Sequence, residues 1–246
     1  MAGHNKWSKI KHIKAKEDAK KGKAFSKVGR DITVAARQGG DNPDMNPALR
    51  LALQKARDVN MPKDNIQRAI EKGAGTGDGA ALEEVIYEAY APGGVAILIR
   101  SLTDNKNRTV PNVRAMLSKA GGSLATSGAV NYLFEKKGVL LFDDHCASDQ
   151  VVELAIESGA DDVDVQDDGA VEVTTTPEAF EAVVSAFNAA NVTYVDASID
   201  MVPQTRIALD LDKAKGFLKL IDKLEDDDDI QDVFHNADIP DAALED

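Results

Sequence analysis

"GVLLFDDHCASDQVVELAIESGADDVDVQDDGAVEVTTTPEAFEAVVSAFNAANVTYVDASIDMVP", residues 138–203, sets two helical patterns among four strand-like ones. The helical patterns are SDQVVELAIESG and PEAFEAVVSAFNAAN, and short apolar or alternating runs lie before, between and after them. The order is therefore strand, helix, strand, strand, helix, strand, which is the split βαβ arrangement of ferredoxin-like modules. We expect an α/β domain of this type here.

The segments on either side predict a second α/β unit. EEVIYEAYAPGGVAILIRSL, residues 83–102, predicts two strands joined by a turn at Pro92-Gly93-Gly94. Thr109 is the expected cap of a helix through Leu117, and AVNYLFEKKGVLLFD predicts two strands separated by Lys136-Lys137-Gly138. After residue 203, LDKAKGFLKLIDKL predicts a helix, followed by the acidic run EDDDD and the strand IQDVFHN. We interpret the acidic run as solvated surface.

The first 72 residues predict three short helices. KAFSKVGRDITVAARQGG has apolar residues at helical spacing and ends in two glycines. Asn46 is the expected N-cap of a second helix with Pro47 at its first position, and Pro62 opens a third. GAGTGDGA, residues 73–80, lacks a preceding strand and the spacing of a phosphate loop, so we interpret it as a linker. The fold class expected is multidomain α+β, with a three-helix bundle followed by two α/β domains.

Length and composition limit the class of protein. The 246 residues are enough for two or three domains, and 43% hydrophobic with 29% charged residues is typical of soluble globular chains. No apolar run approaches the ~20 residues that cross a bilayer, and no apolar segment of a secretory signal follows the first charges. The single cysteine, Cys146, is compatible with a reducing compartment. We expect a cytoplasmic protein without a membrane partner.

Charge is divided unevenly along the chain. Residues 1–72 hold 17 basic and 8 acidic residues, whereas residues 73–246 hold 12 basic and 34 acidic ones. The chain therefore joins a module of net +9 to a body of net −22. Such a dense group of positive charges favours contact with a polyanion. A solvated lysine-rich surface is the alternative.

No pattern in the sequence indicates catalysis, a metal or a cofactor. The four histidines are scattered, and the acids of "FDDHC", residues 142–146, would raise the pKa of the cysteine thiol rather than activate it. Motifs of serine hydrolases, zinc proteases and P-loop enzymes do not occur. We therefore expect a protein that is not an enzyme, with no small-molecule substrate evident.

The candidate interface is cationic. "TDNKNRT", residues 103–109, places Lys106 and Arg108 before a helix N-terminus, which favours either a phosphate site or an ordinary capped loop. In residues 1–30, nine lysines and one arginine surround Trp7, a composition suited to phosphate contacts and base stacking more than to base reading. The candidate nucleic-acid contacts are Lys6, Trp7, Lys9, Lys11, His12, Lys14, Lys16, Lys20, Lys21, Lys23, Lys27, Arg30, Lys106 and Arg108.

Several long motifs resemble the YebC family and its relatives among mitochondrial translational activators. They are MAGHNKWSKIKHIKAKEDAKKGKAFSK, DNPDMNPALRLALQKARDVNMPKDNIQRAIEKGAG, TDNKNRT and GGSLATSGAVNYLFEKKG, and the resemblance covers essentially the whole chain. It implies three domains with the third inserted in the second. The expected boundaries are residues 1–78 for the arm and bundle, 79–134 with 204–246 for the middle domain, and 135–203 for the insert.

The resemblance also implies a function. Members of the YebC family are described as probable DNA-binding transcriptional regulators, while the mitochondrial relatives and some bacterial ones assist translation on the ribosome. The expectation is therefore a non-enzymatic DNA-binding regulator of gene expression. The alternative is a translation factor that uses the same basic segment on ribosomal RNA. The acidic body and the lack of an Arg-, Asn- or Gln-rich recognition helix favour RNA on physical grounds.

Overall fold

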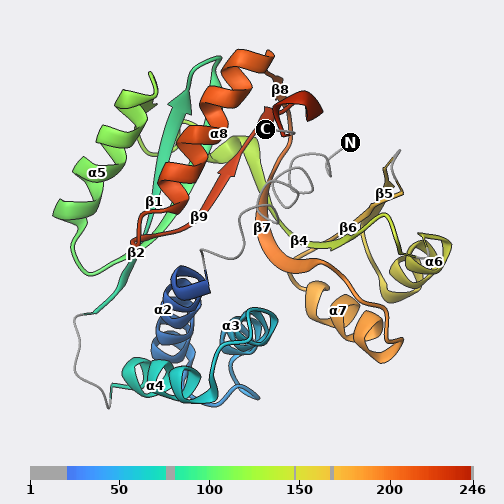
Figure 1. Ribbon diagram of the computed structural model, residues 1–246. Helices are drawn as coiled ribbons and strands as arrows, with labels where there is room; N and C mark the ends of the chain where they lie inside the picture. Colours follow the sequence, from blue (N-terminus) through green and yellow to red (C-terminus); the bar gives the residue numbers. More distant parts are fainter. Residues whose placement is uncertain (1–20, 76–80, 147, 167–168, 245–246) are drawn as a thin grey trace.

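The computed structural model describes residues 21–75, 81–146, 148–166 and 169–244, which form a helical bundle, two four-stranded sheets with their helices and one two-stranded sheet (Figure 1). The bundle consists of α2 (Lys21–Gly39), α3 (Pro47–Asp58) and α4 (Lys63–Gly73). The predicted apolar stripes meet in its core, where Ile32, Leu49 and Ala56 are fully buried. The three helices expected from the first 72 residues are therefore present.

Asn46 fixes the connection between α2 and α3. Its Oδ1 accepts a hydrogen bond from the backbone N–H of Leu49 at 3.1 Å, as expected for the predicted N-cap. Its Nδ2 donates to the carbonyl oxygens of Ala35 and Gly40, both at 2.8 Å. One buried side chain therefore caps α3 and holds the end of α2 against it.

The middle sheet has the strand order β3-β1-β2-β9, and all its pairs are antiparallel. It contains β1 (Glu83–Ala91), β2 (Val95–Thr103), β3 (Ser123–Leu124) and β9 (Ile230–His235). The β1–β2 turn uses Gly93 and Gly94 at φ of 90° and 81°, a conformation that favours glycine. The hairpin predicted around these glycines is confirmed.

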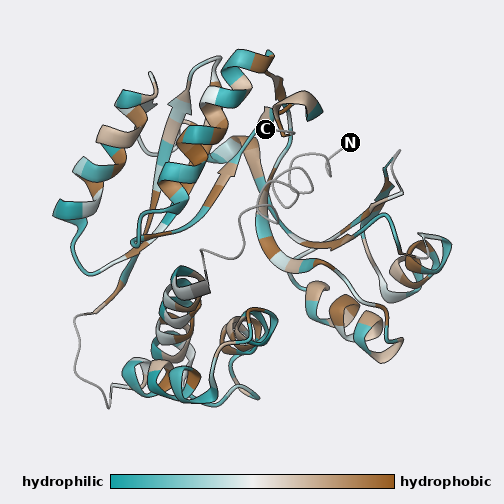
Figure 2. Cartoon of the chain, viewed as in Figure 1, coloured by the Kyte–Doolittle hydropathy of each residue, from teal (hydrophilic) through white to brown (hydrophobic). Residues whose placement is uncertain are grey.

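Two helices cover one face of the middle sheet, α5 (Lys106–Lys119) and α8 (Leu211–Glu225) (Figure 1). Figure 2 shows that the ribbon of α8 alternates between hydrophobic and hydrophilic positions. Its apolar side chains share a core with β2 and β9, and Leu98 on the other face of β2 packs with Val130 and Phe134. Burial on both faces explains why the β2 sequence is almost continuously apolar. Beyond α8 and β9, β10 (Ala237–Asp238) pairs in parallel with β8 (Ile207–Ala208).

The third region has the element order predicted for residues 138–203. Its strands are β4 (Phe134–Phe142), β5 (Asp162–Val165), β6 (Val171–Thr175) and β7 (Asp196–Pro203), and its helices are α6 (Ser148–Ser158) and α7 (Phe180–Ala189). The sheet order β5-β6-β4-β7, with antiparallel pairs throughout, is the arrangement of a split βαβ unit.

The prediction of two strands within residues 129–143 was wrong, because β4 runs without a break from Phe134 to Phe142. Lys136 and Lys137 pair with Met201 and Asp200 of β7, so they lie within the strand. Gly138 is extended rather than part of a turn, and it lets β4 approach Thr175 and Phe180 closely. The glycine therefore marks close packing, one of the common reasons for a glycine in a strand.

The middle sheet draws β1 and β2 from before the third region and β9 from after it. We propose on this pairing the boundaries given above, with residues 135–203 inserted between the two parts of the middle domain.

Glu88 on β1 holds the segment that leads from the middle sheet to β4. Its carboxylate accepts three backbone hydrogen bonds, from Gly128 at 2.6 Å, Val130 at 2.7 Å and Asn131 at 2.9 Å. Burial would raise the pKa of Glu88, but these three bonds outweigh burial and hold the pKa below its ordinary value. The carboxylate is thus ionised and organises the connection between the two sheets.

We expect Glu88→Gln to lower the free energy of unfolding by about 2–3 kcal/mol, because the glutamine NH₂ would face an N–H donor. Urea denaturation followed by circular dichroism would measure the loss. Glu153→Gln, an exposed change on α6, is the matched control and should alter stability little. Equal stability of the two variants would contradict this role of Glu88.

Candidate nucleic-acid interface

Most of the residues predicted to contact nucleic acid lie outside the described residues. These are Lys6, Trp7, Lys9, Lys11, His12, Lys14, Lys16 and Lys20. Lys21 begins α2, and Lys23, Lys27 and Arg30 follow it on that helix. Lys106 and Arg108 lie in the first turn of α5. The side chains placed by the structure are those of Lys23, Lys27, Arg30, Lys106 and Arg108, which come from two elements that meet beside the end of α8.

Three cations of α2 contact the acidic run that follows α8. Lys23 Nζ lies 3.1 Å from Asp226 Oδ1, and Lys27 Nζ donates to the carbonyl oxygen of Glu225 at 2.8 Å. Arg30 Nη1 donates to the carbonyl oxygens of Leu102 and Asp228 and to Asp229 Oδ1. The spacing i, i+4, i+7 puts these side chains on one side of α2, where they bind the bundle to the middle domain.

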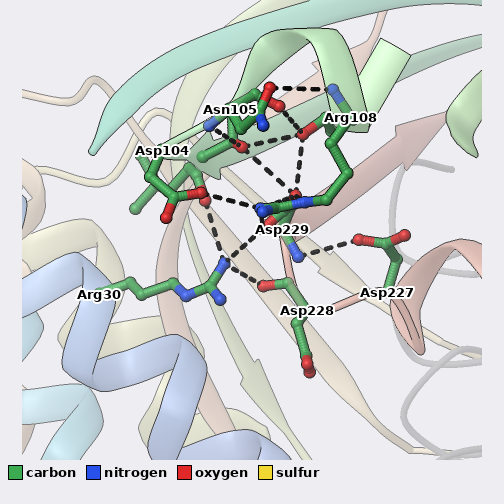
Figure 3. Close-up of polar contacts among 10 residues, drawn as sticks. Arg30, Asp104, Asn105, Arg108, Asp227, Asp228 and Asp229 are labelled. Atoms are coloured by element: carbon green, nitrogen blue, oxygen red, sulfur yellow. Dashed lines mark hydrogen bonds and ion pairs between the residues drawn. The ribbon is translucent and has the colours of Figure 1, made fainter. Parts of the chain in front are cut away.

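Asp229 is the centre of this junction (Figure 3). Asp229 is 5% exposed. Its carboxylate accepts hydrogen bonds from Arg108 Nη2 at 2.8 and 2.9 Å, from Arg30 at 3.1 Å and from Thr109 Oγ1 at 2.8 Å. Burial would raise the pKa of Asp229, but the bonds from Arg108, Thr109 and Arg30 outweigh it and hold the pKa below its ordinary value. One ionised carboxylate thus joins α2, α5 and β9.

This finding corrects the interpretation of EDDDD as solvated surface. Asp228 is exposed, but Asp229, directly before β9, is buried and fully engaged. Asp229 was not predicted because four acidic residues precede it, and nothing in its residue type distinguishes it from them. Its position directly before an apolar strand was the available signal.

The cap of α5 also differs from the prediction. Asn105, not Thr109, is the N-cap, and its Oδ1 accepts from the backbone N–H of Arg108 at 3.1 Å. Thr109 lies inside the helix and is fully buried. Its hydroxyl donates a hydrogen bond to the carboxylate of Asp229. The anion position expected near this N-terminus is thus occupied by the protein's own carboxylate.

Both candidate cations of α5 are bound to carboxylates. Arg108 contacts Asp104 at 2.9 Å as well as Asp229, and its bonds to Asp229 and Asp104 raise the pKa of its guanidinium. Lys106 forms an ion pair with Glu83 of β1. A phosphate at this position would have to compete with these carboxylates, so the phosphate site proposed for Lys106 and Arg108 remains a prediction.

A second, partly buried ion cluster, which was not predicted from the sequence, links α2 to the middle sheet. Arg100 of β2 donates to Asp232 Oδ2 at 2.6 Å and to Asp31 Oδ1 at 2.9 Å. Burial would lower the pKa of Arg100, but both carboxylates outweigh burial and raise it. The available signal was a single arginine within the apolar strand VAILIRSLT. Together with Asp229, this cluster fixes α2 on the edge of the middle sheet.

The single cysteine, Cys146, lies in surroundings that do not activate its thiol. Burial and then the neighbouring Asp143 raise the pKa of the Cys146 thiol, and a raised pKa makes a cysteine a weaker nucleophile at neutral pH. Within the described ranges, no three His, Cys, Asp or Glu side chains are grouped to hold a metal ion. In that same part of the chain, no helix has both the length and the apolar content needed to span a membrane.

Comparison with known proteins gives full-length matches. A family model for the TACO1/YebC protein N-terminal domain matches residues 5–76, and one for the TACO1/YebC second and third domain matches residues 82–237. The chain is 50% identical to a probable transcriptional regulatory protein of Idiomarina loihiensis, over 99% of this chain and 98% of that one. A relative of the same description from Shewanella oneidensis is also 50% identical, over 100% and 99% of the two chains.

A solved structure supports the same likeness. The crystal structure of a conserved hypothetical protein from Aquifex aeolicus matches with a TM-score of 0.83 at 44% identity. The match covers 91% of this chain and 92% of the other. The similarity therefore extends over the bundle and both sheets.

Proposed function

This chain belongs to the TACO1/YebC family, and on that premise we propose that it is a non-enzymatic, DNA-binding regulator of gene expression. Its relatives carry the description of probable transcriptional regulatory proteins. The observation that carries the proposal is the charge division, with net +9 in residues 1–72 and net −22 in the rest. A cytoplasmic location agrees with the single cysteine.

The contacts of α2 divide the candidate cations into two roles. Lys23, Lys27 and Arg30 bind the acidic run of the middle domain, which supports a role in attachment. We assign the phosphate contacts to the basic residues that precede them, Lys6 to Lys21. In this scheme the attached end of α2 determines where the basic segment leaves the body.

RNA on the ribosome is the second candidate target, and two observations favour it. The exposed residues of α4 include Asp64 and Glu71 beside Lys63, Arg68 and Lys72, so α4 does not present the one-signed surface suited to the DNA groove. The acidic body would also repel a long duplex at low ionic strength. A short basic segment can enter folded RNA while the acidic body stays outside.

The proposal predicts that Lys9→Glu combined with Lys14→Glu weakens nucleic-acid binding by at least about 100-fold near 0.1 M salt, because each reversal removes a phosphate contact and adds repulsion. Fluorescence anisotropy with duplex DNA and single-stranded RNA, repeated over a salt series, would measure it. The parent should show a log–log slope of about −5 on duplex DNA for six contacts, and the variant a slope shallower by about 2.

Lys119→Glu with Lys219→Glu is the matched control, because it changes the same charge at exposed sites of α5 and α8. It should bind within about threefold of the parent, the remaining effect being long-range. Unchanged binding by the Lys9/Lys14 variant would contradict the proposal. Sedimentation of cell extract after DNase or RNase treatment would then separate the two targets, since only the relevant nuclease should release the protein.

A further inference from the structure

A cavity of about 400 Å³ lies where the bundle, the middle sheet and the third sheet meet. Residues of α2, α3, β7 and β9 line it, together with single residues of β4 and β6. Its volume falls within the range of small-molecule sites, ~300–1,000 Å³, and junctions between domains are frequent positions for such sites. The ion clusters described above account for only part of its polar lining.

Gln231 of β9 lies in this cavity at a β-bulge. Ser101 pairs with Ile230 and Arg100 with Asp232, so Gln231 is the extra residue opposite β2. The bulge lets both Ile230 and Val233 enter the core of the middle domain although they are three residues apart. It also displaces Gln231 from the regular alternation, and bulges commonly redirect a side chain at functional sites.

The amide of Gln231 has unused hydrogen-bonding capacity. The residue is 8% exposed, and neither its Oε1 nor its Nε2 has a hydrogen-bond partner among the described residues. Burial of an amide without partners is unfavourable and uncommon in native proteins. A ligand that supplies an N–H to the oxygen would remove the part of this cost that comes from Oε1, so the amide oxygen points to an occupant with hydrogen-bond donors.

The charge of the lining identifies the kind of occupant. Six carboxylates line the cavity, against the three cations Lys27, Lys55 and Arg206. Asp31 and Asp232 share the single positive charge of Arg100. Loss of hydration raises the pKa of Asp58, a hydrogen bond from Gln54 lowers it, and the nearby Asp196 carboxylate raises it further. The carboxylates of Asp58 and Asp196 thus lie at the same end of the cavity. A phosphate would be repelled there and a cation attracted.

Apolar residues form the rest of the wall, among them Val59, Met201 and Val202. They suit an alkyl chain. We propose that the cavity binds a small organic cation, an alkyl amine or alkyl guanidine, whose N–H groups bond Gln231 and whose charge faces Asp58 and Asp196. Such a ligand would touch the bundle and the third sheet at once and so fix their relative position.

Agmatine, a guanidinium and an ammonium joined by a butyl chain, is the probe. Calorimetric titration of the full chain at low salt should give saturable binding at one site. Gln231→Leu and Asp58→Asn should each weaken binding by about tenfold, through loss of one charge-assisted contact. Asp161→Asn removes the same charge at an exposed position outside the cavity and should leave affinity within about twofold.

The comparison probes make the outcome decisive. Neutral N-butylacetamide and AMP should show no saturation. Non-saturable binding of agmatine, equal affinity in Gln231→Leu and the parent, or tighter binding of AMP would each overturn the proposal. Gln231→Leu removes only unpartnered polar atoms, so its melting temperature should equal or exceed that of the parent. If Gln231→Leu fails to fold, Asp58→Asn, on the surface of α3, still tests the site against Asp161→Asn.

Discussion

Asp229→Asn is expected to lower the free energy of unfolding by about 2–4 kcal/mol. The asparagine would keep the shape of the side chain but lose its charge, and its NH₂ could not accept the bonds that Arg108 and Thr109 now donate. Arg30 would also lose its buried anionic partner, although its bonds to two carbonyl oxygens would remain. Urea denaturation at neutral pH would measure the change.

The same variant should remove part of the acid sensitivity of the chain. Because the folded-state pKa of Asp229 is lowered, its contribution to stability is complete above the unfolded carboxyl pKa of ~3.9 and is lost as the pH falls through the folded value. The difference in free energy of unfolding between the parent and Asp229→Asn should therefore become smaller below about pH 4.

Asp228→Asn is the matched control for Asp229→Asn. Asp228 is exposed and contributes its backbone carbonyl, not its carboxylate, to the contact with Arg30. Its replacement should change stability by less than about 0.5 kcal/mol. If Asp229→Asn proved as stable as Asp228→Asn, Asp229 would not be the centre of the junction.

Gly138→Ala is expected to cost about 3 kcal/mol of unfolding free energy. A Cβ at this position would overlap Thr175 Oγ1 and the Phe180 ring, and would lie 2.8 Å from Phe180 Cβ. Both neighbours are buried, and β4 is held between β6 and β7, so the clash cannot be relieved by a small shift of one side chain. Thermal unfolding of the full chain, followed by circular dichroism, would show the loss.

Gly216→Ala is the control, and it should change the free energy of unfolding in the opposite direction. Gly216 lies inside α8, and no heavy atom lies within 4 Å of the position that an alanine methyl group would take, so alanine adds helix propensity without a clash. It should raise stability by about 1 kcal/mol. A Gly138→Ala variant as stable as the parent would show that the close approach of β4 to Thr175 is not required.

Local patterns were sufficient for most elements of this fold. The Asn46 cap, the Pro92-Gly93-Gly94 hairpin and the element order of residues 138–203 depend on neighbours within a few positions, and all are present. The errors occurred where distant packing outweighed local preference. The local pattern at Gly138 indicated a turn, but the glycine packs against Phe180 within a strand. The local pattern at Thr109 indicated a helix cap, but its hydroxyl donates a hydrogen bond to Asp229.

The amino-acid sequence alone established the charge division, the basic segment as the candidate interface and the order of helices and strands in residues 138–203, because each is a property of neighbouring residues. Which cations bind carboxylates of the same chain came from the folded arrangement. Arg30 and Arg108 meet Asp229 from 199 and 121 residues away, and Gln231 is displaced by a bulge between β2 and β9. Pairing of β2 with β9 creates these contacts, and no local pattern encodes strand pairing over such a distance.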